Sequence, residues 1–257
     1  MGLGATQGRG ARLGRAQGPT RMTAGGVVLV LPGGRETSER APSPLAGGSA
    51  RGFGRHLARQ GRQQGLIAHV VRYRALGWNG ERAVLASDAE WAVDETVRRY
   101  GDVPVCLAGF GMGGRAALRA GGHPAVYSVL ALAPWLPAED AEPPEPVKQL
   151  AGRRVMIVHG TKDHRNDPEL SFQLAARAKK ANRDVCRFEV HADGHGLRQY
   201  RDEVRALAVD FVLGTLFGTR FARPVLDALK APPPLGLRMP LASGFGTGVT
   251  ARNGSRR

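Results

Sequence analysis

The sequence has few cysteines and no long apolar run, and both absences narrow the class of protein. It contains two cysteines, Cys106 and Cys186, each within an apolar stretch, so we expect buried thiols and no disulfide. No run of about 18 apolar residues is present, so we expect no membrane-spanning helix and no membrane partner. The N-terminal residues lack the contiguous apolar segment of a secretory signal. Cytoplasmic residence is therefore the expectation.

Acidic residues are also scarce: 22 stand against 37 lysines and arginines, a formal net charge of +15. Such an excess is typical of chains that bind nucleic acid. Here it lies mainly at the two ends, since residues 1–24 contain four arginines and no acid, and residues 218–257 contain seven basic residues and one aspartate. The 193 residues between them carry +5, without a recognised nucleic-acid motif or interleaved aromatics. We therefore expect no nucleic-acid partner.

The same two ends are predicted to lie outside the folded domain. Residues 1–24 are rich in Gly and Arg, and residues 218–257 in Pro, Gly and Arg, compositions that bury too little apolar surface to become ordered. We predict that both are disordered, and Met22 is a candidate start of translation. Residues 25–217 are predicted to form one domain.

Between these ends, apolar runs alternate with amphipathic segments. Strands are predicted over 27–31, 66–73, 103–108, 126–133, 154–159 and 185–191. Helices are predicted around 53–58, over 81–100, from the Gly109–Gly114 turn to 120, and over 168–181 and 197–216. This alternation predicts an α/β fold: a mostly parallel, doubly wound sheet of about six strands with helices on both faces.

Four loops that follow predicted strands carry the candidate chemistry. They contain Gly33 and Gly34 after the first strand, the turn Gly109–Gly114 after the third, Asp163 after the fifth and His195 after the sixth. The carboxyl ends of parallel strands meet at one edge of the sheet, where ligands and reactive residues collect. The four loops are therefore expected to form one site.

Taken together, these loops resemble the α/β-hydrolase family over roughly residues 27–217. The order of elbow, aspartate and histidine matches, and small lid-less esterases and dienelactone-hydrolase-like enzymes are most similar in outline. The resemblance implies that Asp163 orients His195, that His195 is the general base, and that the backbone N–H groups of Met112 and of Gly34 or its neighbour form the oxyanion hole. The polar segment 136–146 is too short for a substantial lid, so the site is expected to be open.

The departure from the family is at the nucleophile. The family motif is Gly-x-Ser-x-Gly, whereas this chain reads Gly109-Phe110-Gly111-Met112-Gly113. Glycine has no atom that can attack a carbonyl carbon, so an acyl-enzyme at residue 111 is impossible. The backbone turn itself is easier for glycine than for serine. Phe110 also stands where related elbows often carry histidine. We predict an intact fold that lacks the covalent step.

The remaining candidate residues also fit structural roles. Phe110, Trp78 and Trp135 follow predicted strands and are candidates for an apolar rim around a substrate, with Gly33 beside it, although core packing explains the aromatics nearly as well. His159 closes a strand and is expected to be packed or hydrogen-bonded. His164 and Asp167 are rival assignments for the dyad, although Asp167 is expected to cap the helix that starts at Pro168. No Cys, His and carboxylate cluster has metal-ligand spacing, so neither a metal nor another cofactor is expected.

Three functions fit this sequence. The first is an esterase-like protein that binds a small acyl or ester-type molecule without covalent serine catalysis. The second is an enzyme in which the Asp163–His195 dyad acts as a general base without a serine. The third is a non-catalytic scaffold with a vestigial dyad. No feature of the sequence indicates an oligomeric state.

Overall fold

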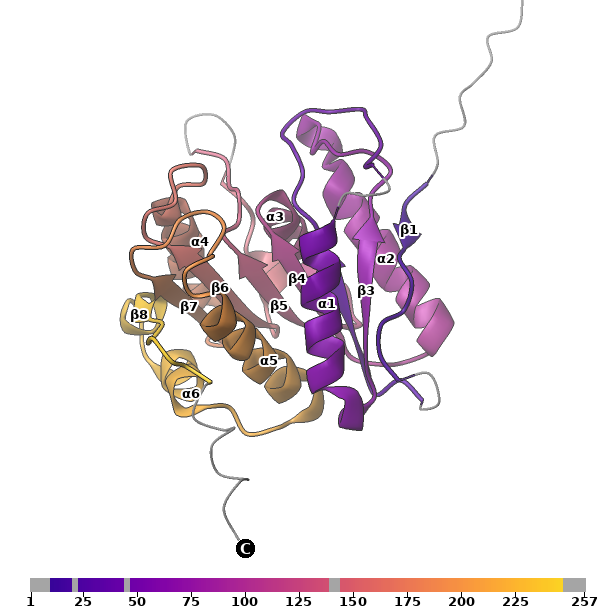
Figure 1. The fold of residues 1–257 in the computed structure, drawn as a ribbon. Coiled ribbons are helices and arrows are strands. Elements are labelled where there is room, and N and C mark those ends of the chain that lie inside the picture. The colour runs from indigo at the N-terminus through magenta and orange to yellow at the C-terminus, as the bar shows by residue number, and fades with distance from the viewer. Residues whose placement is uncertain (1–9, 20–22, 44–46, 139–143, 247–257) are drawn as a thin grey trace, which may run out of the picture.

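A computed structural model describes residues 10–19, 23–43, 47–138 and 144–246, and these form an eight-stranded sheet with helices on both faces (Figure 1). The strand order is β1-β3-β2-β4-β5-β6-β7-β8. β1 pairs antiparallel with β3, and every other neighbouring pair is parallel. The predicted α/β class with a mostly parallel sheet is confirmed, whereas the expected number of about six strands is too low.

The six predicted strands form the middle of the sheet because each is a run of apolar residues that both faces of a covered sheet can bury. Their bounds are β2 Gly26–Leu31, β3 Leu66–Arg72, β4 Val105–Phe110, β5 Val126–Leu132, β6 Arg154–Gly160 and β7 Val185–Val190. The edge strands are short: β1 Arg12–Leu13 and β8 Met239–Pro240.

The helices cover the sheet in two layers, and a hydrophobic core lies under each. Side chains of α2 Val84–Tyr100, α3 Met112–Arg119 and α4 Pro168–Ala181 pack in one core. Side chains of α1 Gly48–Gln60, α5 Arg201–Phe217 and α6 Arg223–Lys230 pack in the other. Short 3₁₀ turns lie at 62–64, 80–82, 120–122, 148–150 and 235–237. Within the described residues, no helix is long and apolar enough to cross a membrane.

The prediction that residues 1–24 are disordered is wrong for 10–19. Arg12 and Leu13 form β1 opposite Arg72 and Val71 of β3, and Gln17 exchanges backbone hydrogen bonds with Ala68. A two-residue strand at a sheet edge is held by its backbone, so its side chains give no period that sequence analysis could detect. Residues 1–9 and 20–22 lie outside the described part of the chain.

The prediction that residues 218–257 are disordered is likewise wrong for 218–246. α6 and β8 pack on the end of the sheet (Figure 1), and Val225, Ala228 and Leu237 are fully buried there. Residues 247–257 lie outside the described part. The high Pro and Gly content of this segment predicts disorder, but its few buried apolar residues are enough to pack it on the sheet.

Two buried cations from the domain hold this C-terminal segment by its carbonyl groups. Lys179 Nζ of α4 donates hydrogen bonds to the carbonyls of Ala228 and Leu229 at 3.2 and 3.1 Å. Arg187 Nη1 of β7 donates to the carbonyl of Leu237 at 3.1 Å. Cations that bind the last carbonyls of a helix are a recurrent way of ending it. The segment is therefore an integral layer of the domain.

Leucines 235 and 237 test whether this segment contributes to stability. Leu237→Ala should lower the free energy of unfolding by about 2–5 kcal/mol, because Leu237 is fully buried and its truncation leaves a cavity. Leu235→Ala, the matched control, should change it by less than about 0.5 kcal/mol, since Leu235 is 67% exposed. Urea unfolding followed by circular dichroism measures both, and equal effects would contradict the packing described here.

Candidate functional site

Gly111 lies in a sharp turn between the end of β4 and the start of α3. Its backbone angles are φ 52° and ψ −118°, a region that side chains other than glycine enter only at a cost in strain. Its N–H donates to the carbonyl of Leu132 and its own carbonyl accepts from the N–H of Trp135, both at 3.0 Å. Hydrogen bonds to the last residue of β5 and to the segment that follows it thus fix this turn from both sides.

Gly113 requires its small size for a different reason. A Cβ atom at Gly113 would lie 2.3 Å from the carbonyl oxygens of Leu31 and Pro32, far inside van der Waals contact. The first turn of α3 therefore approaches the end of β2 more closely than any side chain allows. This contact sets the distance between the elbow and the loop that follows β2.

Asp163 and His195 meet although 32 residues separate them. They occupy the loops after β6 and β7, and His195 Nδ1 lies 3.0 Å from Asp163 Oδ2. The Asp163 side chain is fully buried, whereas that of His195 is 34% exposed. With Nδ1 held by the carboxylate, Nε2 of the same ring faces away from Asp163. The pairing has the geometry of an acid that orients a general base.

The Asp163 carboxylate accepts hydrogen bonds from several groups. The N–H groups of Arg165 and Asn166 donate to Oδ1 at 2.9 and 3.1 Å, and His159 Nε2 lies 3.3 Å from Oδ2. Burial by itself raises the pKa of the carboxyl group, but the hydrogen bonds from His159, the two N–H groups and His195 outweigh it and hold the pKa below its ordinary value. Asp163 is therefore a carboxylate at neutral pH.

Three residues that sequence analysis did not assign to the site position this dyad. His159, expected to be packed, is fully buried between Ser171 and Asp163. Asn166 Nδ2 donates to the carbonyl of Ala133 at 2.7 Å. The buried Asp193 accepts N–H bonds from the loop that carries His195. His159 lies in β6 and Asp163 in the loop after it, four residues later. Their spacing in the sequence does not by itself predict contact, because the contact depends on how this loop turns.

The Asp193 side chain also explains where α5 begins. Its Oδ2 accepts from the N–H groups of Gln199 and Tyr200 at 3.0 and 3.2 Å, so the chain over 194–200 closes around the carboxylate instead of entering a helix. α5 consequently starts at Arg201, four residues after the predicted start at Leu197. The histidine loop is therefore longer and firmly anchored.

The predicted oxyanion donors lie beside the elbow. Met112 is the first residue of α3, where a helix leaves the N–H group without an acceptor of its own. A Cβ atom at Gly34 would lie 3.6 Å from Met112 Cβ, so the loop after β2 approaches the start of α3. This placement is compatible with the two N–H donors that the sequence predicted, and their role stays a prediction.

There is space for a small side chain at residue 111. A Cβ atom built on Gly111 would lie 3.8 Å from His195 Cε1 and 3.8 Å from Asn166 Nδ2, which is ordinary van der Waals distance. The imidazole of His195 is therefore within reach of any hydroxyl group carried at this position. The structure brings residues 111, 163 and 195 together in the expected arrangement.

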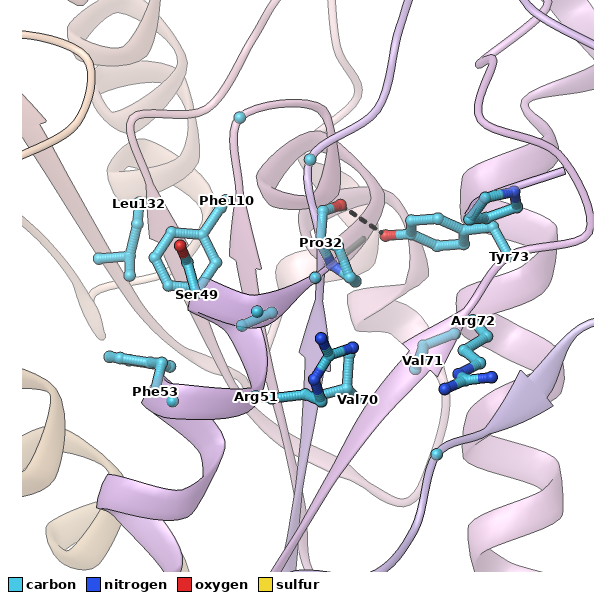
Figure 2. Close-up of a pocket in the computed structure, with 18 of the residues that line it drawn as sticks. Pro32, Ser49, Arg51, Phe53, Val70, Val71, Arg72, Tyr73, Phe110 and Leu132 are labelled. Atoms are coloured by element: carbon cyan, nitrogen blue, oxygen red, sulfur yellow. Dashed lines mark hydrogen bonds between the residues drawn. The ribbon is translucent and has the colours of Figure 1, made fainter. Parts of the chain in front are cut away.

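A cavity of about 1020 Å³ opens in front of these residues. Gly111, His195, Gly33 and Phe110 all line it. Figure 2 shows Phe110, Phe53 and Leu132 together on one side of this cavity, and the rings of Phe53 and Phe110 meet edge to face with centroids 5.1 Å apart. The volume is at the upper end of the range that small-molecule sites occupy.

The two tryptophans predicted for the rim lie elsewhere. Neither Trp78 nor Trp135 is among the residues that line the cavity. Trp78 is buried, and the Arg115 guanidinium lies 3.9 Å from its ring centroid and 5.1 Å from that of Trp135. A buried ion pair between Arg115 and Glu145, 2.7 Å from Nε to Oε2, completes this stack. The tryptophans are thus part of a cation–π cluster, and of the predicted aromatics Phe110 alone lines the cavity.

Neither a hydroxyl group nor a thiol of the described residues is paired with His195. Cys106 and Cys186 are fully buried in β4 and β7, and burial raises the pKa of both thiols to about 12. Within the same residues no group of three or more His, Cys, Asp or Glu side chains could hold a metal.

Solved structures with the same fold include several esterases. The esterase Pf2001 of Pyrococcus furiosus superposes with a TM-score of 0.58 at 15% identity, over 75% of this chain and 83% of that one. Est1E of Butyrivibrio proteoclasticus gives 0.58 at 14%, over 80% and 99%. A monoacylglycerol lipase of Paleococcus ferrophilus gives 0.56 at 14%, over 79% and 99%. No protein-family model and no curated protein matches the chain. The fold is therefore that of the α/β hydrolases.

The lowered pKa of Asp163 predicts how the free energy of unfolding depends on pH. Asp163→Asn should lower the free energy of unfolding at pH 7 by about 1–3 kcal/mol, because buried donors lose their charged acceptor. The folded pKa is depressed, so this stabilisation is fully present above the unfolded pKa of about 4 and is lost progressively as pH falls from there towards the folded pKa. The difference between wild type and variant should shrink over that range.

Asp167→Asn is the matched control for this measurement. Asp167 caps α4 by accepting from the N–H of Glu169 at 2.8 Å, and asparagine caps a helix about as well as aspartate. Denaturant unfolding at pH 7, 5 and 3.5 should give a small difference for this control at every pH. The gap between wild type and Asp163→Asn should narrow further at about pH 2.5, and a gap that is the same at about pH 2.5 as at pH 7 would show that its charge is not the source of the stabilisation.

Proposed function

We propose that this protein is an esterase-like hydrolase relative that binds a small acyl or ester-type molecule in the cavity in front of Gly111 and forms no acyl-enzyme. One observation carries the proposal: residue 111 occupies the elbow, with φ 52°, and has no side-chain atom. Loss of the nucleophile from a serine protease lowers turnover by about 10⁶, leaving roughly 10³–10⁴ over the uncatalysed rate. A protein without this nucleophile can therefore still bind its ligand, although rapid turnover is lost.

The retained machinery supports a ligand of carbonyl type. The predicted oxyanion donors, the N–H groups of Met112 and Gly34, lie beside the turn, and the oriented imidazole of His195 borders the cavity. Phe53, Phe110 and Leu132 provide an apolar wall suited to an acyl or aryl group. The esterases with the same fold bear the same general chemistry in their names, and ferulic acid is bound to Est1E in one of its structures.

A second candidate function is activation of water by the dyad, and the partial exposure of the His195 ring favours it. In that reaction Nε2 removes a proton from a water molecule while the water oxygen bonds to the carbonyl carbon of an ester. The two N–H donors hold the oxyanion that forms. When the carbonyl re-forms, the alcohol oxygen leaves and takes the proton from Nε2. No covalent bond to the protein is needed.

Restoring the hydroxyl group tests the leading proposal. Gly111→Ser should raise kcat/KM for p-nitrophenyl butyrate by about 10²–10⁴-fold, because a serine here is within reach of His195. It should also become labelled by a fluorophosphonate probe, which leaves the wild type unlabelled. Gly111→Ala is the control, since it adds the same Cβ and the same strain of about 1–2 kcal/mol without the oxygen. A serine variant no faster than the alanine variant would refute the proposal of an intact hydrolase site.

The water-activation candidate is tested in the wild-type background. His195→Ala should lower residual turnover of p-nitrophenyl butyrate by about 10²-fold or more, which is the usual contribution of a general base. His164→Ala is the matched control, because His164 is exposed beside Asp163 and has no part in the proposed reaction. Equal residual turnover in all three proteins would exclude water activation by the dyad and leave the binding function.

A further inference from the structure

The charged residues that line the cavity in front of Gly111 are all basic. Its described lining contains no aspartate or glutamate. The same lining contains seven arginines, namely Arg12, Arg15, Arg51, Arg72, Arg198, Arg201 and Arg205. Clefts lined by charge of one sign concentrate ligands of the opposite sign, because low-dielectric walls focus the field. The lining therefore favours an anion over a neutral ligand.

Two of these arginines are forced together by the edge of the sheet. Arg12 of β1 lies directly opposite Arg72 of β3 in the antiparallel pair, so both side chains are on the same face of the sheet. Like charges placed directly opposite each other destabilise a pair of strands. Within the described residues, neither arginine has a carboxylate within ion-pair distance.

Elsewhere on the molecule, neighbouring arginines are neutralised by acids. Arg98 and Arg99 on α2 share the carboxylate of Glu95, and Arg238 lies between Glu169 and Glu189. Arg12 and Arg72 differ from these arginines in that no described carboxylate lies between them, and a bound anion would relieve their repulsion.

Arg72 and the aromatic pair of Phe53 and Phe110 lie on different sides of the cavity. In Figure 2, Arg72 stands next to Val71 on the far side of the cavity from Phe110 and Leu132. Phe110 directly precedes Gly111 in the chain, whereas Arg72 lies at the sheet edge formed by β1 and β3. A ligand that contacts both Phe110 and Arg72 therefore has an apolar group at one end and an anionic group at the other.

We infer that the cavity binds an amphiphilic anion: an acyl or aryl group packs on Phe53 and Phe110 near Gly111, and a carboxylate or phosphate at its other end is held by Arg12 and Arg72. The planar guanidinium group favours these two anions, because its paired N–H donors match their oxygen atoms. This inference rests on the proposed small-molecule function of the same cavity and specifies the class of that molecule.

Binding of three probes with the same chain tests the inference without any need for turnover. Octanoate and octyl phosphate should bind the wild type at least about tenfold more tightly than octanamide, measured by isothermal titration calorimetry at low salt. The preference should weaken as the salt concentration rises. The two anionic probes also distinguish a carboxylate from a phosphate as the favoured group.

The double variant Arg12→Gln/Arg72→Gln should lose this tenfold preference and keep the wild-type Kd for octanamide, which shows that its cavity is intact. The control Arg62→Gln/Arg183→Gln removes the same charge from exposed residues that do not line the cavity, and it should keep the preference. Octanamide binding equal to that of the anions in wild type, or a preference that survives the first double variant, would overturn the inference while leaving the proposed function in place. Failure of all three probes to bind would contradict both.

Discussion

The close contact between the first turn of α3 and the end of β2 is the constraint on which the candidate site depends. Carbonyl oxygens of Leu31 and Pro32 occupy the space where a side chain at Gly113 would be. The turn at Gly111 lies two residues before this contact, where the chain leaves β4 and enters α3 within one residue. The turn, the loop after β2 and the start of α3 are thereby placed at one point on the sheet.

A second constraint is the buried charge of Asp163. A carboxylate away from water is unfavourable unless donors surround it, and here two backbone N–H groups and two histidines do so. This network stabilises the loop after β6 whether or not a reaction takes place. Part of the role of the Asp163–His195 pair is therefore structural.

Basic residues at the two edges of the sheet contact the cavity and the C-terminal segment. β1 places Arg12 opposite Arg72, and both arginines line the cavity. At the opposite edge, Lys179 and Arg187 bind carbonyl groups of the C-terminal segment, and Arg187 also pairs with the carboxylate of Glu189.

The sequence by itself determined the six central strands, the helices between them, and the order of Gly111, Asp163 and His195. Apolar period and turn residues are local properties, and parallel strands bring their carboxyl ends together. Only the tertiary structure decided that His159 and Asn166 support the dyad, that Trp78 and Trp135 stack on Arg115, and that residues 10–19 and 218–246 belong to the domain. These features depend on backbone hydrogen bonds and on contacts between residues distant in the chain, which leave no periodic signal in the order of amino acids.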